Sequence, residues 1–293
     1  MDTDMIMELR NVKQYFRISN RMTIRAVDGV SFGIRRGEVF GLVGETGCGK
    51  STVSRMISGI YQPTEGEVLF EGEPITGRYP AGARKKLQRE MQLIFQDSAA
   101  SLNPRMTVEQ IILEPLFIQG KRGHMQESRQ RLEALMKDVG LDRDFLSKRP
   151  GELSGGQRQR VAIARSLILD PKLIVADEPV ASLDISIQAQ IITLFQRLQR
   201  EKGFSFLFIA HDLSVVRFIS DRVGVMLKGK LVELAGTEEL YTHPVHPYTK
   251  ALLSAIPIPD PILERKKKIL YYDTGQPLGE TMKECSPGHF VLE

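Results

Sequence analysis

An eight-residue glycine loop constrains this chain more than any other feature, because it requires a strand before it and a helix after it. Gly44 to Ser51 reads Gly-Glu-Thr-Gly-Cys-Gly-Lys-Ser and matches the pattern G-x-x-x-x-G-K-[ST]. The apolar run Val39 to Val43 precedes it as an expected strand, and Lys50 to Ile60 follows with helical spacing. In such a loop, backbone N–H groups cradle phosphates, while Lys50 neutralises their charge and the Ser51 hydroxyl binds Mg²⁺.

A second phosphate-binding element is expected at Leu153-Ser154-Gly155-Gly156-Gln157. Ser154 is a natural N-cap for a following helix, and the two glycines allow backbone N–H groups to approach a phosphate closely. Lys50 and Ser51 already complete one phosphate cradle elsewhere in the chain. We therefore hypothesise that this chain carries halves of two shared sites.

Two acids end the apolar run Leu173 to Ala176, which reads as a buried strand. Open α/β sheets bind ligands at this carboxyl edge of their strands. Asp177 is expected to hold Mg²⁺ through water, and Glu178 to orient or deprotonate an attacking water. Acids here could instead cap the next helix, but Pro179 and the phosphate loop favour the catalytic interpretation.

Two polar residues follow other expected strands. His211 comes directly after the apolar run Phe204 to Ala210. A lone histidine is more often a satisfied core residue, but its place at the expected nucleotide edge favours a contact with the γ-phosphate. Gln96 follows Leu93-Ile94-Phe95 and is uninformative by itself.

Strands that alternate with helices predict a parallel sheet covered on both faces. The first stretch, to about residue 43, is β-rich, residues 97–151 read as a helical insertion, and the proline-rich tail after Gly236 reads as an appendage separate from the sheet. The expected elements are strands at 39–43, 173–176 and 204–210, helices at 50–60, 127–139, 157–169 and 186–202, and hairpins turning at 71–72 and 228–229.

Composition limits the class of protein. No stretch approaches the roughly 20 apolar residues that span a bilayer, and the acidic start Met1 to Asp4 does not read as a secretory signal. The two cysteines, Cys48 and Cys285, argue against a disulfide framework and favour a cytoplasmic protein. The net charge of +4 is spread along the chain and is weak evidence for nucleic acid; solvated surface is the simpler interpretation, and a surface that faces a membrane or phosphates is the alternative.

Together these motifs resemble the ATP-binding subunit of an ABC transporter, over about residues 5 to 235. The resemblance implies that Tyr15 stacks on adenine, with Phe16 as the neighbouring candidate and a core aromatic as the alternative. It identifies Gly44 to Ser51 as Walker A, Gln96 as the Q-loop residue, 153–157 as the signature motif, 181–184 as the D-loop and His211 as the switch histidine. The implied catalytic set is Glu178, His211 and Lys50, the metal set is Ser51, Gln96 and Asp177, and the nucleotide set is Tyr15, Gly44, Glu45, Thr46, Gly47, Cys48, Gly49, Lys50, Ser51, Thr52, Gln96, Ser154, Gly155, Gly156, Gln157 and Asp184.

The resemblance also implies the fold and its divisions. It gives an α/β fold with a P-loop NTPase (RecA-like) core, an N-terminal antiparallel β subdomain, a helical signature subdomain and an oligopeptide-transporter-type C-terminal extension. The expected boundaries are 1–96 and 158–235 for the core, 97–157 for the helical subdomain and 236–293 for the extension. In this family two ATP-binding domains meet head to tail, so that one subunit's signature motif faces the other's Walker A loop.

A narrower resemblance points to the dipeptide, oligopeptide and nickel importer branch. Phe95-Gln96-Asp97 followed by 101–108, and the segment 243–253, look like that branch, although Ser98 stands where it commonly has proline. Many relatives carry a C-terminal cysteine cluster that binds an iron–sulfur centre. Here only Cys285 remains, so ATP and Mg²⁺ are expected without an iron–sulfur cluster.

The branch resemblance implies a peripheral subunit on the cytoplasmic face of the membrane. Its expected partners are a second, non-identical ATPase, two transmembrane permeases and an extracytoplasmic binding protein, without nucleic acid. Nickel, glutathione-like thiols or antimicrobial peptides stay open as cargo, and a soluble ATPase acting on nucleic acid or ribosomes is the alternative from another class. His243 and His246 are expected to pack the tail rather than bind metal, and Cys48 is interpreted as a tolerated small residue rather than a redox switch.

Overall fold

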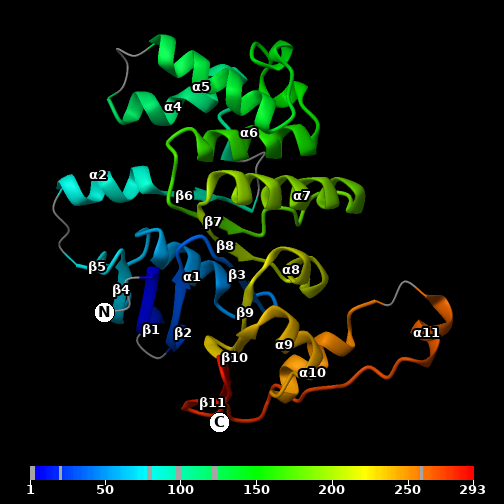
Figure 1. The fold of residues 1–293 in the computed structure, drawn as a ribbon. Coiled ribbons are helices and arrows are strands. Elements are labelled where there is room, and N and C mark those ends of the chain that lie inside the picture. The colour runs from blue at the N-terminus through cyan, green and yellow to red at the C-terminus, as the bar shows by residue number, and fades with distance from the viewer. Residues whose placement is uncertain (1–3, 20–21, 78–80, 97–100, 121–124, 258–259) are drawn as a thin grey trace.

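The loop at Gly44 to Ser51 is carried by a large mixed sheet, seen in the computed structural model of the chain (Figure 1). The structure describes residues 4–19, 22–77, 81–96, 101–120, 125–257 and 260–293. Within these residues the sheet has eight strands in the order β11-β12-β10-β9-β3-β8-β7-β6. Its parallel strands are β3 (Val39–Val43), β6 (Met91–Ile94), β7 (Leu173–Asp177), β8 (Ser205–Ile209) and β9 (Arg222–Leu227).

Each central strand contributes to two separate cores, one on either face of the sheet. In β7, Leu173 and Val175 join one core, whereas Ile174 and Ala176 join the other. Both faces are apolar because both are covered, which is why these strands read as continuous apolar runs in the sequence. The first core also includes α1 (Lys50–Ile57), and the second includes α6 (Gly155–Leu167), α7 (Ile185–Lys202) and α8 (Leu213–Ile219).

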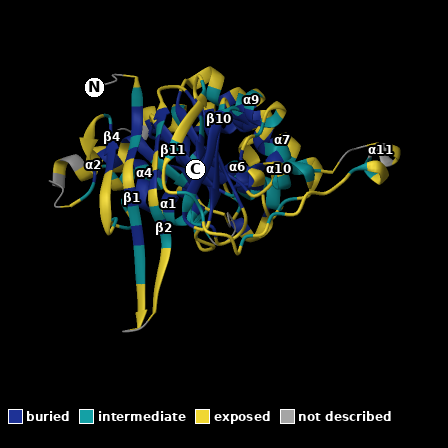
Figure 2. Ribbon diagram, turned by 90° about the horizontal axis from the view of Figure 1, so that it is seen from below, coloured by how far each residue is buried: buried dark blue, intermediate teal, exposed yellow. Residues whose placement is uncertain are grey.

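A smaller antiparallel sheet covers the α1 side, in the order β2-β1-β4-β5. The predicted hairpin through Glu71 and Gly72 is confirmed, and both residues have positive φ angles of 52° and 79°. The ends of the two long strands project from the body and are exposed (Figure 2). The strands are β1 (Met5–Ser19), β2 (Met22–Arg35), β4 (Glu65–Phe70) and β5 (Glu73–Pro74).

The predicted helical insertion is built on the other side, where α4 and α5 lie above α6 (Figure 1). The four apolar positions that predicted a helix, Leu132, Leu135, Met136 and Val139, are all buried in the second core. Asp97 and Ser98 lie outside the described residues. The elements here are α4 (Val108–Ile118), α5 (Met125–Asp138) and the 3-10 turns η1 (Arg143–Phe145) and η2 (Pro150–Glu152). Helix α2 (Ala81–Glu90) precedes β6 and contributes Leu87 to the first core.

The prediction that the tail lies apart from the sheet is wrong. Strand β12 (His289–Leu292) pairs antiparallel with β10 (Lys230–Gly236), and β11 (Met282–Ser286) pairs with β12. The prolines only break the middle of the tail, into α9 (Thr237–Thr242), α10 (Pro247–Ser254) and the projecting α11 (Pro261–Lys266). Two short strands paired to a distant partner give no apolar run that sequence analysis can detect.

Three further predictions compare closely with the structure. Helix α1 ends at Ile57, and Gly59 follows with a φ of 69°, as expected for a glycine that ends a helix. Helix α6 begins at Gly155 rather than Gln157, because Ser154 itself is the N-cap. In the part of the chain that the structure describes, no helix is both long and apolar enough to cross a membrane.

Candidate functional site

The glycine loop joins β3 to α1 and fits into a narrow space between neighbouring backbones. A Cβ atom on Gly44 would lie 2.2 Å from the Met226 carbonyl oxygen, and one on Gly49 would lie 2.3 Å from the Ala26 carbonyl oxygen. Both glycines also have positive φ angles, 149° and 111°. Only glycine meets both conditions without strain, so the glycine pattern follows from how β9 and β2 flank the loop.

Lys50, at the start of α1, turns its ammonium group back over the loop. Its Nζ donates to the Gly44 carbonyl at 2.7 Å and to the Glu45 carbonyl at 2.9 Å, and only 4% of the residue is exposed. These acceptors are neutral, and none of the described carboxylates forms an ion pair with it. A buried cation is stable only beside an anion, so the loop fits a phosphate chain.

Ser51 and Asp177 bring an alcohol and a carboxylate together below the loop. The Ser51 hydroxyl donates to Asp177 Oδ1 at 3.1 Å, and Asp177 is 8% exposed. Burial raises the pKa of Asp177, and the hydrogen bond from Ser51 opposes this effect only in part. A hard cation would favour the charged carboxylate, so this pair of oxygen donors fits Mg²⁺.

Glu178 is the meeting point of three strand ends. Gln96, after β6, donates from Nε2 to Glu178 Oε2 at 2.9 Å, and His211, after β8, lies 3.4 Å from the same oxygen through Nδ1. Glu178 has a positive φ of 49°, an uncommon conformation for a residue other than glycine that is concentrated at functional sites. The structure thus brings together the three predicted residues that could handle a water and a terminal phosphate.

Lys50, Ser51 and the cluster around Glu178 face one cavity of about 550 Å³. Its walls include Thr46, Gly47, Lys50, Ser51, Thr52, Gln96, Glu178 and His211. Cys48 lies inside the loop and is buried, and burial raises the pKa of its thiol. A protonated, buried thiol is inert, which agrees with the interpretation of Cys48 as a tolerated small residue.

The signature motif has the predicted helix start but lies away from this cavity. Ser154 Oγ accepts from the Gln157 N–H at 3.3 Å, and Gln157 Oε1 accepts from the Ser154 N–H at 2.9 Å, which forms a capping box. Ser154 is exposed, and residues 153–157 are not among those that line the cavity. Within one chain, therefore, the two phosphate-binding elements do not meet.

The signature glycines also have a packing role that the sequence does not reveal. A Cβ atom on Gly156 would lie 2.8 Å from Ile187 Cγ2, and one on Gly155 would lie 3.2 Å from Leu183 Cδ2. The start of α6 thus abuts the predicted D-loop and α7. Asp184, the last residue of that loop, is the N-cap residue of α7 and is exposed.

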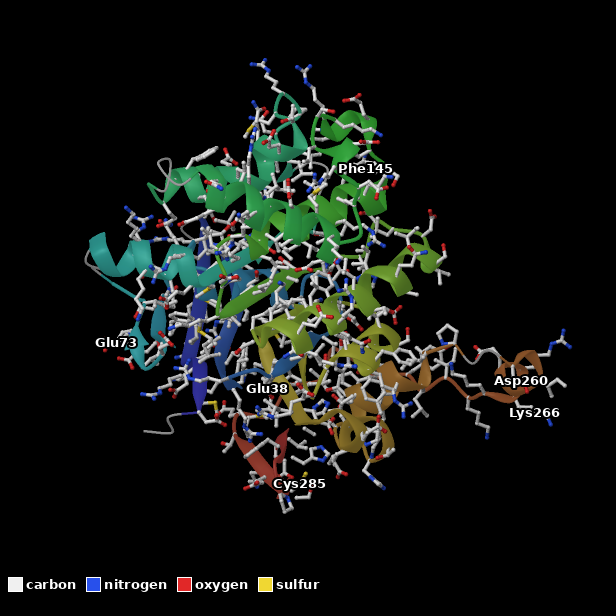
Figure 3. All side chains as sticks on the ribbon, turned by 45° about the horizontal axis from the view of Figure 1, so that its top comes forward. Glu38, Glu73, Phe145, Asp260, Lys266 and Cys285 are labelled. Carbon is white, nitrogen blue, oxygen red and sulfur yellow. The ribbon has the colours of Figure 1, made fainter. Side chains whose placement is uncertain are left out.

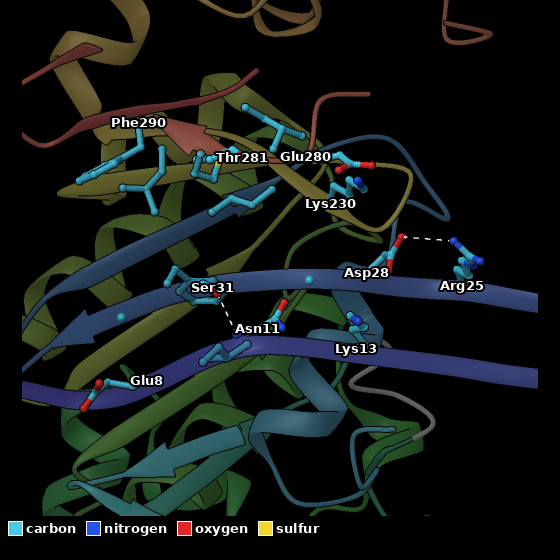
Figure 4. Close-up of a pocket in the computed structure, with 18 of the residues that line it drawn as sticks. Glu8, Asn11, Lys13, Arg25, Asp28, Ser31, Lys230, Glu280, Thr281 and Phe290 are labelled. Carbon is cyan, nitrogen blue, oxygen red and sulfur yellow. Dashed lines mark hydrogen bonds and ion pairs between the residues drawn. The ribbon is translucent and has the colours of Figure 1, made fainter. Parts of the chain in front are cut away.

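Tyr15 lies in a different place from the one predicted for it. It lines a larger cavity of about 1100 Å³ between β1, β2 and the C-terminal hairpin (Figure 4), with its hydroxyl bonded to Asp28. Phe16 is the cross-strand partner of Ile24, which lines the cavity beside the glycine loop. Successive side chains of a strand point to opposite faces, so Phe16 lies on the face of β1 opposite the Tyr15 cavity, together with Ile24.

Among the described residues, the histidines and the cysteine of the tail do not form a cluster that could hold a metal ion. His246 caps α10 by accepting from the Tyr248 N–H, whereas His243 is exposed beside Glu239. Cys285 lies on the outer C-terminal hairpin (Figure 3). One contact escaped sequence analysis: Tyr248 Oη accepts from the Glu45 N–H at 3.2 Å, across a separation that leaves no local pattern.

Comparison with protein-family models gives two matches. Residues 27–181 match the ABC transporter model, and residues 232–277 match the model for the oligopeptide/dipeptide transporter C-terminal region. The second match begins within β10 and ends before β11.

Curated proteins resemble the chain over nearly its full length. "Oligopeptide transport ATP-binding protein OppF" of Bacillus subtilis is 53% identical, with 99% of this chain and 96% of the relative covered. The protein of the same name from Streptococcus mutans is 48% identical, with 98% and 94% covered.

Solved structures share the fold of about four fifths of the chain. A dimeric, post-hydrolysis structure of the ATP-binding cassette MJ0796 bound to ADP and Pi aligns with a TM-score of 0.71 and 31% identity. That alignment covers 79% of this chain and 98% of the other. CbiO1 from Clostridium perfringens aligns with a TM-score of 0.72 and 29% identity, over 82% and 92% of the two chains.

Proposed function

Because this chain belongs to the ATP-binding proteins of ABC transporters, we propose that it hydrolyses ATP to energise a membrane complex that imports dipeptides or oligopeptides. One observation carries the proposal: Lys50, Ser51 and the Gln96–Glu178–His211 cluster line a single cavity, and Asp177 is hydrogen-bonded to Ser51. A phosphate chain, a hard cation and an attacking water are the reactants that these groups suit.

In the proposed reaction, Lys50 and the loop N–H groups bind the phosphates, and Ser51, Gln96 and Asp177 would hold Mg²⁺. The cation supplies positive charge that offsets the phosphate oxygens. Glu178 accepts a proton from the attacking water, and the side-chain amide of Gln96 keeps the carboxylate oriented for this step. His211, half exposed beside Glu178, contacts the γ-phosphate.

We assign the adenine contact to Phe16 in place of Tyr15. The Phe16 ring packs edge-on against Tyr61 at 5.5 Å, on the face of β1 that looks toward the loop. The Tyr15 ring is occupied on the other face, where Asp28 holds its hydroxyl and Arg25 lies 5.5 Å from its centre. An aromatic face beside the phosphate loop offers a stacking surface for a base.

We propose that the active form is a head-to-tail pair with a second, non-identical ATPase. Ser154 of the signature motif is exposed, and the motif lies outside the chain's own cavity, so another chain's loop is needed to use it. The similar MJ0796 cassette is itself dimeric in its solved structure. In such a pair, ATP bridges the two subunits, and hydrolysis of the bridging phosphate allows the pair to open.

Peptide cargo is inferred from the relatives named for oligopeptide transport and from the C-terminal match at 232–277. We propose that the chain is a peripheral subunit at the cytoplasmic face and docks onto two permeases. An extracytoplasmic protein delivers the substrate. The core at 1–96 and 158–235, the helical subdomain at 97–157 and the extension at 236–293 act as its working units, with ATP and Mg²⁺ and without an iron–sulfur cluster.

Purification of the membrane complex through a tag on this chain tests the proposal. We expect a second ATPase, two permeases and a binding protein to co-purify, and peptide-loaded binding protein to stimulate ATP hydrolysis. The same complex with the Glu178→Gln chain is the control, and its loss of hydrolysis measures the turnover at this chain's own site. Co-purification with ribosomes, or stimulation by nickel ions but not by peptides, would refute it.

A further inference from the structure

The C-terminal extension reaches back to the phosphate loop through one side chain. Tyr248, near the start of α10, is 1% exposed, and its hydroxyl oxygen accepts the Glu45 N–H at 3.2 Å. Burial raises the pKa of Tyr248 well above its ordinary value, so the hydroxyl is neutral at physiological pH. A neutral hydroxyl at this point accepts a backbone hydrogen bond without adding charge to a loop that binds anions.

Tyr248 is held firmly in place by buried neighbours. Its own N–H donates to His246 Nδ1 at 3.1 Å. Glu233, fully buried on β10, accepts the N–H groups of Val245 at 2.7 Å and His246 at 3.1 Å. The Tyr272 ring packs edge-on against the Tyr248 ring at 5.6 Å.

A second support comes from the end of the chain. His289 on β12 is 1% exposed and lies 2.8 Å from Glu233 Oε1 through Nε2. The paired strands β10 and β12 therefore position the Glu233 carboxylate, and this carboxylate holds the start of α10. The Tyr248 hydroxyl is positioned by this chain of contacts.

Glu45 links this support to the charge that binds phosphate. Its N–H is bonded to Tyr248, and its carbonyl accepts both the Lys50 ammonium at 2.9 Å and the Cys48 N–H at 3.2 Å. A rotation of the backbone at Glu45 would move the carbonyl that orients Lys50. Tyr248 thus restrains Glu45, one of the two residues whose carbonyls accept the Lys50 ammonium.

We propose that Tyr248 is a positioning residue of the ATPase, through which the C-terminal extension sets the affinity of the phosphate loop for ATP. The inference rests on the proposed function only in that Lys50 binds the phosphates of ATP. Tyr248 lines neither the cavity nor the Glu178 cluster, so its effect falls on binding and not on the chemical step.

Tyr248→Phe is the informative variant, because it keeps the ring and removes the acceptor. The variant removes the hydrogen-bond acceptor of the Glu45 N–H, and we expect the Kd of a fluorescent ATP analogue, and KM for ATP in the assembled complex, to rise about 5- to 30-fold. The kcat should stay within about twofold of the wild-type value, because a binding loss without a loss of chemistry appears in KM. Tyr272→Phe is the matched control, since it alters a neighbouring ring that has no hydrogen bond to the loop, and it should change neither constant.

The outcomes separate this inference from the proposed function. If the wild-type chain binds no ATP, the proposed function fails. If it binds ATP and Tyr248→Phe binds equally well, only the role of Tyr248 is refuted, as it is if kcat falls while KM is unchanged. Should the variant not fold, hydrogen exchange in the wild-type chain decides: protection of the Glu45 amide supports the proposal, and exchange at the rate of an unprotected amide overturns it.

Discussion

Glu71 gives a prediction whose size can be worked from the structure. It sits in the turn between β4 and β5 and forms ion pairs with Arg36 at 2.9 Å, Lys86 at 3.3 Å and Lys172 at 2.8 Å. Burial alone would raise the pKa of Glu71, but hydrogen bonds from Lys172, Arg36 and Lys86 outweigh it and lower the pKa from 4.5 to about 2. These three cations come from separate parts of the chain, so Glu71→Gln should weaken the global fold.

The pKa shift sets an upper limit to the effect. A change from 4.5 to about 2 is about 2.5 pKa units, or about 3.4 kcal/mol at 1.36 kcal/mol per unit. The partners Arg36, Lys86 and Lys172 are 42% to 54% exposed, so solvent screens part of this. We expect Glu71→Gln to lower the free energy of unfolding by about 1 to 2 kcal/mol at pH 7.

The pH dependence has a definite sign. Because the folded pKa lies below the unfolded value, the stabilisation is complete above about pH 5 and disappears as the pH falls toward 2. At pH 3, the stabilisation from Glu71 has fallen to the equivalent of about 1 of the 2.5 pKa units. The difference between wild type and Glu71→Gln should therefore shrink by more than half between pH 7 and pH 3.

Urea unfolding at both pH values measures this difference. Glu73→Gln is the matched control, because Glu73 lies two residues away and is exposed at the margin of the molecule (Figure 3). It should change the unfolding free energy little at either pH. A Glu71→Gln effect that is equal at pH 7 and pH 3, or no larger than that of Glu73→Gln, would refute the reasoning.

Three further predictions concern the ATP site and its neighbour. Glu178→Gln should keep ATP binding and slow turnover by about 10² to 10⁴, the usual contribution of a positioned base, and near-normal hydrolysis would remove Glu178 from this role. Phe16→Ala should weaken ATP binding about tenfold, the scale of one lost stacking contact, whereas Tyr15→Ala should not; titration with a fluorescent ATP analogue would contradict the assignment if the order were reversed. Gly156→Ala places a Cβ 2.8 Å from Ile187 Cγ2 and should destabilise the chain by about 1 to 3 kcal/mol. Adding Ile187→Leu, which has no methyl branch at the Cγ2 position, should restore part of the loss in thermal unfolding, and no relief would argue against the clash.

Local patterns in the sequence were sufficient for the core of the fold. The run Val39 to Val43 matches β3, and the four buried positions of α5 have the spacing that predicted them. The residues at strand ends could also be predicted, because carboxyl ends of parallel strands meet at one edge of a sheet. Gln96, Asp177 and His211 reach the site in this way.

Tyr15 and Phe16 show a limit of such patterns. Two adjacent aromatic residues point to opposite faces of a strand, so a shift of one position exchanges their roles. The pairing of β1 with β2 shifts register between Gln14 and Tyr15, among other places. Alternation counted along the sequence therefore could not tell which ring faces the loop.

Long-range pairing is the other limit of the sequence. The contact between Tyr248 and Glu45 and the pairing of β12 with β10 join segments far apart in the chain. Neither has a local signature, because the residues involved are ordinary for a helix start or a short strand. These contacts make the C-terminal extension part of the sheet and of the loop's surroundings.

The central claim is that the signature motif completes another subunit's ATP site. In the purified complex, photo-labelling with an ATP analogue, followed by separation of the two ATPases, measures occupancy at each Walker A loop. Thr107→Ala is the matched control for Ser154→Ala, because Thr107 forms the same capping box at the start of α4. With Ser154→Ala we predict a loss of labelling on the partner ATPase and near-normal labelling on this chain. Thr107→Ala should leave the labelling of both ATPases near normal. Loss confined to this chain's own loop would contradict the account.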